Sequence, residues 1–127
     1  LGYKAASASL SIIFGAPTPT IAATIPTTGL VVKGTPGVAL WATFTNNTGS
    51  SVYLQVYDLA SGPPANGARA AWAAPAITTN GNSRAGDIIG GTFGLGCANG
   101  ILVILSLSPV TYSAVASTNA SVSFQSY

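Results

Sequence analysis

The sequence is very poor in charged residues. Only 5% of its 127 residues are charged, whereas soluble domains usually contain about 25%. The chain has no histidine, and its only carboxylate side chains are those of Asp58 and Asp87. General acid–base catalysis near neutral pH usually needs histidine or a carboxylate with a shifted pKa. The composition therefore argues against an enzyme, and we expect no catalytic residues.

The sequence also lacks the residues that usually form metal and cofactor sites. Zinc sites are built from Cys and His, and calcium sites from several carboxylates. The glycine-rich stretch GGTFGLG (90–96) lacks the Lys-Ser/Thr ending of a phosphate-binding loop. The single cysteine, Cys97, excludes an intrachain disulfide. Because no sequence neighbour would lower its pKa, we expect a buried or half-buried structural thiol, and we expect no cofactor and no metal.

The two carboxylates leave one alternative open, which is a catalytic dyad of Asp58 and Asp87. Each of them, however, lies at a boundary between a strand and a loop, where Asp is a common turn residue. We expect Asp58 to end a strand and to accept hydrogen bonds from loop amides near Ala60 and Ser61.

The small number of charged residues also indicates which kinds of partner molecule the chain can bind. The net charge is only +2. The four basic residues are scattered along the chain, at Lys4, Lys33, Arg69 and Arg84. A nucleic-acid groove needs clustered basic residues and is not predicted. A polar surface without charge repulsion suits burial against other proteins. We therefore expect contacts with partners or with copies of the chain itself, in a homo-oligomer or a lattice.

Residues 88–107 form an uncharged stretch of membrane-spanning length. The stretch contains several glycines and an Asn-Gly pair, and it has no basic flank to set an orientation. We therefore do not expect contact with a membrane.

The chain reads as a single all-β domain over residues 1–127. Its 15 glycines and 8 prolines divide it into short apolar runs, and no segment keeps the spacing of an amphipathic helix for more than about two turns. About eight strands with regular turn signals predict a two-sheet antiparallel sandwich, either jelly-roll or immunoglobulin-like. The predicted strands are 7–14, 30–33, 38–46, 52–57, 70–77, 87–89, 101–107 and 120–127.

Two further segments complete the predicted domain. Residues 1–6 form an extended N-terminal arm, and residues 15–29 form an extended connector rich in proline, which disfavours helix. The chain begins at Leu1 rather than Met, which indicates a processed or incomplete product.

Two neighbouring strands, 38–46 and 52–57, show the clearest alternation. We expect them to form a hairpin across the NNTGS turn, with one set of side chains facing the core. The inward-facing residues are expected to be Leu40, Ala42, Phe44, Val52, Leu54 and Val56. The run ILVILSL (101–107) is apolar at almost every position, which predicts a central strand covered on both faces.

Aromatic side chains fall on the second face of this hairpin, and aromatic residues with little competing charge are common at the centres of protein interfaces. The candidate interface residues are Trp41, Tyr53, Tyr57, Trp72 and Tyr127. The alternative is that other strands or the connector cover this face.

Three stretches carry a resemblance to known proteins: VYLQVYDLASGPPANGARA (52–70), CANGILVILSLSPVTYSA (97–114) and VSFQSY (122–127). They resemble small virion structural proteins of tailed bacteriophages. The resemblance implies a non-enzymatic β-sandwich on the capsid exterior, which decorates or cements the particle by binding the major capsid protein across its joints. Where such proteins place charged residues in the loop after the Asp, this chain has SGPP (61–64).

A second hypothesis is a receptor- or glycan-binding module of a tail fibre or surface appendage. In that case exposed Trp41, Trp72 or tyrosine side chains would stack on sugars. The first hypothesis expects these side chains in a protein–protein interface instead.

Overall fold

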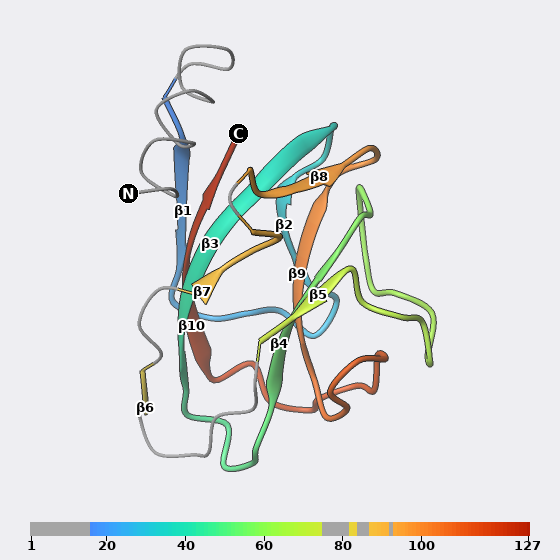
Figure 1. Ribbon diagram of the computed structural model, residues 1–127. Coiled ribbons are helices and arrows are strands. Elements are labelled where there is room, and N and C mark those ends of the chain that lie inside the picture. The colour runs from blue at the N-terminus through green and yellow to red at the C-terminus, as the bar shows by residue number, and fades with distance from the viewer. Residues whose placement is uncertain (1–15, 75–81, 84–86, 92) are drawn as a thin grey trace.

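The computed structural model describes residues 16–74, 82–83, 87–91 and 93–127, and these residues form an all-β sandwich (Figure 1). The described residues contain ten strands and no helix. The strands are β1 (Thr18–Ala22), β2 (Leu30–Lys33), β3 (Gly37–Asn46), β4 (Tyr53–Tyr57), β5 (Trp72–Ala73), β6 (Asn82–Ser83), β7 (Asp87–Ile88), β8 (Leu95–Cys97), β9 (Ile101–Ser106) and β10 (Ala120–Ser126). The predicted all-β class and two-sheet antiparallel arrangement are confirmed.

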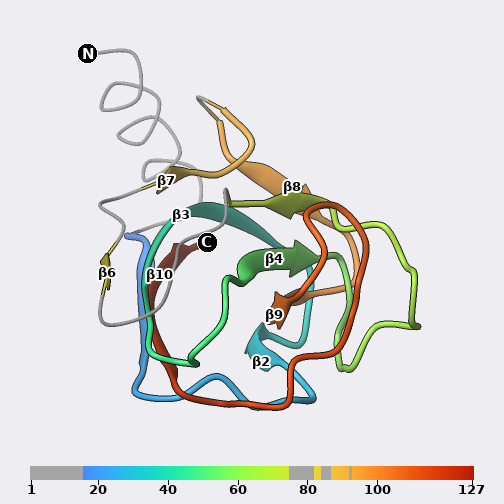
Figure 2. The same cartoon turned by 90° about the horizontal axis from the view of Figure 1, so that it is seen from below.

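The larger sheet has six strands and the smaller sheet has four. In the large sheet β10 lies between β1 and β3, and the short strands β6, β7 and β8 each pair with β3. The small sheet has the order β2-β9-β4-β5. Figure 2 shows β1, β10 and β3 on one side of the molecule and β2, β9 and β4 beside them.

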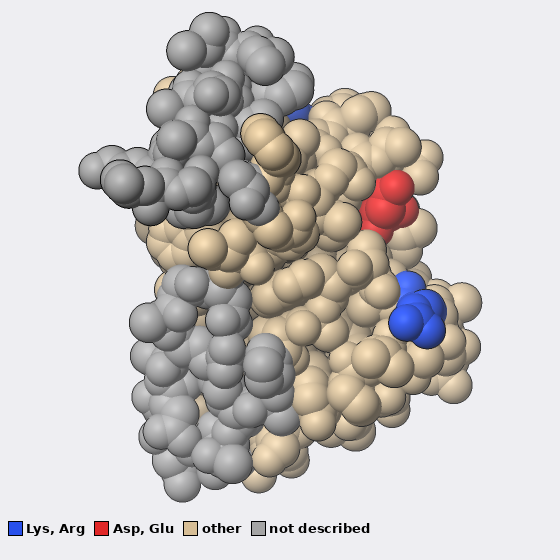
Figure 3. All heavy atoms as spheres, viewed as in Figure 1, with Lys and Arg blue, Asp and Glu red and all other residues tan. Residues whose placement is uncertain are grey.

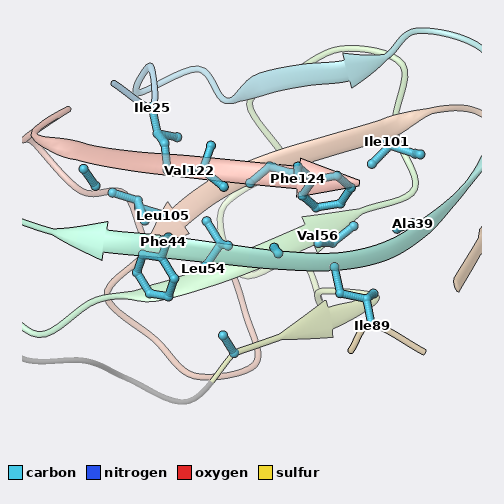
Figure 4. Close-up of a cluster of buried hydrophobic side chains, with 14 of the residues drawn as sticks. Ile25, Ala39, Phe44, Leu54, Val56, Ile89, Ile101, Leu105, Val122 and Phe124 are labelled. Carbon is cyan, nitrogen blue, oxygen red and sulfur yellow. The ribbon is translucent and has the colours of Figure 1, made fainter. Parts of the chain in front are cut away.

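The core lies between the sheets, where the inward side chains of both meet (Figure 4). Along most of β10 and β3 the buried residues alternate with more exposed ones, and most of the buried ones are apolar, including Phe44, Val122 and Phe124. They pack against inward residues of β4 and β9 such as Leu54 and Val103. Burying one such side chain contributes about 1.5–3 kcal/mol to stability, so this alternation drives the pairing of the two sheets.

The prediction of a central strand over 101–107 is confirmed. All six residues of β9 are buried, and β9 lies between β2 and β4. Ile101, Val103 and Leu105 face the main core. Leu102 and Ile104 belong to a second cluster on the other face of the small sheet, which the loops around Leu59, Ala68 and Tyr112 cover.

The predicted hairpin of β3 and β4 is wrong. β3 pairs with β10 in the large sheet, whereas β4 pairs with β9 in the small sheet. The NNTGS turn carries the chain from one sheet to the other, and the side chain of Asn46 holds this corner by donating to the carbonyl of Ser50 and accepting from the N–H of Thr48. Two strands that face each other across a core show the same alternation as two that are hydrogen-bonded neighbours, so the pattern did not separate these cases.

Leu40 also departs from the predicted inward set. Opposite Gln125 and Ser126 of β10, the register steps from Trp41 to Ala39, so Leu40 is the extra residue of a β-bulge. As a result Ala39 faces the main core, while Leu40 packs with Val38, Trp41 and Tyr127. The other five residues of the predicted set, Ala42, Phe44, Val52, Leu54 and Val56, do lie in the main core.

The proline-rich connector is extended only in part. It contains a strand, and near its end the N–H of Gly29 donates to the carbonyl of Pro26 in a turn. β1 pairs with β10 along its whole length, with Pro19 opposite Gln125. Proline removes an N–H and is tolerated on an edge strand, and β1 is the outer strand of its sheet. The arm 1–6 and the strand predicted at 7–14 lie outside the described residues, as do positions 75–77 of the strand predicted at 70–77.

The uncharged stretch 88–107 contains β8 and β9, which are strands of the two different sheets. Within the described part of the chain, no helix is long and apolar enough to cross a membrane.

Candidate functional site

The five candidate aromatic residues do not form one cluster. Tyr57 is 4% exposed, and its hydroxyl lies 2.7 Å from the side-chain oxygen of Gln55 and 3.1 Å from the carbonyl of Ala68. Its ring meets that of Tyr112 edge to face, with centroids 6.5 Å apart. Burial, together with the nearby Tyr112, raises the pKa of Tyr57 to about 12. This burial leaves Tyr57 no exposed ring for a partner, and its contacts hold a loop against the small sheet.

Gln55 is a residue that sequence reasoning missed. It is fully buried, and its side-chain N–H groups donate to the carbonyl oxygens of Ser108 at 2.8 Å and Thr111 at 3.2 Å. Its oxygen accepts the hydroxyl of Tyr57. Ser106 adds a bond to the Thr111 carbonyl at 2.9 Å. The loop 107–113 is therefore fixed to the small sheet by buried polar groups. In the sequence, Gln55 alternates with apolar residues like any solvent-facing polar residue.

Tyr53 and Trp72 both line a groove of about 390 Å³ beside the small sheet, together with Arg69 and Val110. They do not face it in the same way. Trp72 lies opposite Val56 in the register and packs against the main core, whereas Tyr53 lies on the other face of β4. The two candidate residues Tyr53 and Trp72 thus lie on different faces of the small sheet.

Trp41 lies on the outer face of the large sheet. This outer face consists of the outward positions of β1, β10, β3 and β7, which are Pro19, Ile21, Ser121, Ser123, Gln125, Trp41, Thr43, Thr45 and Ile88. Ile21 is 79% exposed and Ile88 is 47% exposed. None of these described positions carries a charge. Figure 3 shows one view of the molecule, in which charged residues are few and widely spaced.

Tyr127 is 7% exposed, so it offers little surface to a partner. Its backbone N–H donates to the carbonyl of Val38, and the N–H of Val38 donates back to the carbonyl of Tyr127. Tyr127 lines a pocket of about 440 Å³ between the start of β3 and β8.

Asp58 follows the last residue of β4, as predicted, but its hydrogen-bond partners differ from those expected. Its carboxylate accepts the backbone N–H of Asn99 at 2.8 Å and, at a longer 3.4 Å, that of Gly100. The bond from Asn99 holds the pKa of Asp58 below its usual range. Asp58 therefore ties the end of β4 to the turn between β8 and β9, instead of closing its own loop.

Cys97 is buried, as expected. Burial, and to a lesser extent the charge of Asp58, raises the pKa of its thiol to about 11. Among the described residues no three Cys, Asp, Glu or His side chains come close enough to hold a metal ion. The described part of β7 includes Asp87 but not its side chain, so the hypothesis of an aspartate dyad stays untested.

Models of protein families, curated proteins and solved structures were each compared with the chain, and none of them matches it. Among the described residues, three surfaces are open to contact. These are the uncharged outer face of the large sheet, the groove beside Tyr53 and Arg69, and the pocket beside Lys33 and Tyr127.

Proposed function

We propose that this chain is a non-enzymatic structural protein of a virion, a capsid decoration or cement protein. It lies on the capsid exterior and binds across joints between major capsid proteins, using the outer face of the large sheet. The proposal builds on the sequence resemblance to small virion proteins. The observation that carries it is the uncharged outer face, which has the exposed apolar residues Ile21 on β1 and Ile88 on β7.

The outer face is built in rows that run across the strands. One row consists of Pro19, Gln125, Trp41 and Ile88, which lie opposite one another on β1, β10, β3 and β7. Neighbouring strands are about 4.8 Å apart, so a partner meets apolar groups at the sides of the row and an amide between them. Such a row favours recognition by shape and hydrogen bonds, because no charged side chain takes part.

Binding of this kind has a recognisable dependence on salt. Contacts between exposed charges weaken as ionic strength rises, whereas apolar burial does not. A stable interface usually buries about 1,200–2,000 Å², which is more than one row of a sheet supplies. Repeated contacts on a lattice offset this, because each bound copy raises the effective concentration of the next contact.

The proposal is tested with purified particles from the source of the sequence. The chain is expected to remain with particles through washing in high salt, and particles without it are expected to release their contents at lower temperature. Ser123→Lys places a charge in the middle of the outer face and is expected to abolish binding to bare capsids. Val110→Lys, at an exposed position beside the small sheet, is the matched control. Recovery of the chain only as free protein, or unchanged particle strength without it, would contradict the proposal.

Glycan binding is the second candidate, and the groove lined by Tyr53 and Arg69 favours it. There a sugar would stack on the ring of Tyr53 and accept hydrogen bonds from the guanidinium. Because Trp72 packs against the core, Tyr53→Ala rather than Trp72→Ala is the informative variant. Loss of a glycan-array signal in Tyr53→Ala, with capsid binding absent in the parent chain, would favour this candidate.

A further inference from the structure

The pocket between β3 and β8 has the character of a small-molecule site. Its volume of about 440 Å³ lies within the roughly 300–1,000 Å³ range of ligand pockets, which are mostly apolar with a few polar groups. Its walls include Pro36, Val38, Ala98 and Tyr127. Among the side chains of the described residues that line it, only that of Lys33 is charged.

The floor of the pocket is rigid. Gly37 pairs with Cys97, and Val38 pairs with Gly96, in the β3–β8 register. On its other edge Val38 exchanges two backbone hydrogen bonds with Tyr127, at 2.9 and 2.8 Å. A pocket that is held on both edges by a hydrogen-bonded sheet requires little ordering when a ligand binds, which favours affinity.

The close packing of the floor depends on glycine. A Cβ at Gly37 would lie 2.5 Å from the carbonyl oxygen of Tyr127 and 2.8 Å from Cδ of Lys33. The absence of this Cβ lets the aliphatic stem of Lys33 lie against the floor, and the half-buried side chain of Lys33 lines the pocket. By contrast, a Cβ at Gly96 would meet no atom within 4 Å, so a larger side chain there would occupy open space.

The charges near the pocket select the kind of ligand. The thiol of Cys97 is neutral at physiological pH, because burial raises its pKa to about 11. Asp58 acts on Cys97 from the neighbouring turn, but its carboxylate already accepts the N–H groups of Asn99 and Gly100. The ammonium of Lys33 is thus the group on the pocket wall that can bind an ionised ligand.

We infer that this pocket binds a small aromatic or aliphatic molecule that carries one acidic group. The apolar body of the ligand lies against Val38, Pro36 and Tyr127, and its acidic group binds Lys33. The site is separate in function from capsid binding, and it is tested on the isolated chain.

The test uses two fluorescent probes of similar shape, the anionic anilinonaphthalene sulfonate and the neutral N-phenylnaphthylamine. The native chain is expected to bind the anionic probe more tightly than the neutral one. Lys33→Gln is expected to weaken binding of the anionic probe about tenfold, a change of about 1.4 kcal/mol. The affinity for the neutral probe is expected to stay the same. Asp58→Asn is expected to increase the affinity for the anionic probe, because the substitution removes a nearby negative charge. Gly96→Leu adds a side chain at a position that lines the pocket and is expected to weaken binding of both probes.

Arg69→Gln is the matched control, because it removes the same charge from the groove on the small sheet. Equal effects of Lys33→Gln and Arg69→Gln on the anionic probe would overturn the inference, since net charge alone would then explain the loss. If Gly96→Leu does not fold, the binding site is located in the native chain instead. The measurement is the change in each backbone amide chemical shift when the probe is added. Probe-induced shifts at Gly37, Gly96 and Cys97 support the site, and shifts confined to other residues overturn it.

Discussion

The side-chain amide of Gln55 donates to the carbonyl oxygen of Ser108 at 2.8 Å, joining residues 53 positions apart in the sequence. The amide is fully buried in the middle of β4. Together with Ser106 it holds the loop that lines the groove beside Tyr53. A buried polar group that loses its hydrogen-bond partner destabilises the folded state. Replacing Gln55 is therefore expected to lower stability.

Gln55→Leu is expected to lower the free energy of unfolding by about 1–3 kcal/mol, because the Ser108 carbonyl loses its donor inside the protein. Urea denaturation measures the change. Hydrogen exchange is expected to accelerate in 107–113 and to stay slow in β10. Gln125→Leu, an amide at the outer face, is the control and is expected to change stability by less than about 0.5 kcal/mol. Equal stability of the two variants would show that the Gln55 bonds do not hold the loop.

Two glycines of the same strand pair are expected to respond differently to alanine. Gly37→Ala brings a Cβ to 2.5 Å from the Tyr127 carbonyl, and overpacking of this kind costs about 1–3 kcal/mol. Gly96→Ala meets no atom within 4 Å and is expected to stay within about 0.5 kcal/mol of the parent. Thermal unfolding of both variants compares them directly. A destabilised Gly96→Ala with an unaffected Gly37→Ala would contradict the geometry of the β3–β8 pair.

Asp58 is expected to make stability depend on acidic pH. Its pKa is lowered in the folded chain, so its contribution is present above the unfolded value of about 3.9 and is lost as the pH falls through the folded pKa. Asp58→Asn is expected to flatten the stability profile below about pH 4. In this variant the amide proton of Asn99, in the turn between β8 and β9, is expected to exchange faster with solvent. If stability depends on acidic pH in the same way for parent and variant, the Asp58 carboxylate does not stabilise the contact between β4 and the β8–β9 turn.

Cys97 is expected to react slowly with thiol reagents in the native state. Its pKa of about 11 leaves almost no thiolate at pH 8, and the side chain is buried. The rate of labelling by an aromatic disulfide is expected to rise as the pH approaches 11 and to become rapid after unfolding. Asp58→Asn is expected to shift this rise to lower pH, because a neighbouring negative charge is removed. Fast stoichiometric labelling of the folded chain at pH 8 would contradict the buried position.

Periodicity in the sequence predicted the strands that form most of the core, but it missed β1, β6 and β8 and did not show which strands pair. The runs that became β3, β4, β9 and β10 alternate or stay apolar according to burial, and burial is what periodicity records. Which strand bonds to which is decided by chain crossings such as the corner at Asn46, and these leave no periodic signal. The β-bulge at Leu40 is invisible for the same reason, because it depends on the register with Gln125 and Ser126.

The candidate surfaces were less predictable than the strands. The aromatic residues were recognised by type, but a tyrosine can face solvent, as Tyr53 partly does, or lie beneath a loop, as Tyr57 does. The deciding contact for Tyr57 comes from Ala68 and Gln55, and the position of that loop is a tertiary property. Likewise, the partner of Asp58 lies 41 residues away, beyond the reach of local turn chemistry.

The place of β10 between β1 and β3 has a consequence for biosynthesis. During translation β1 and β3 leave the ribosome long before β10, and until then each has an exposed, uncharged strand edge that another nascent chain could occupy. Each copy therefore has two unpaired strand edges until its last strand has been synthesised.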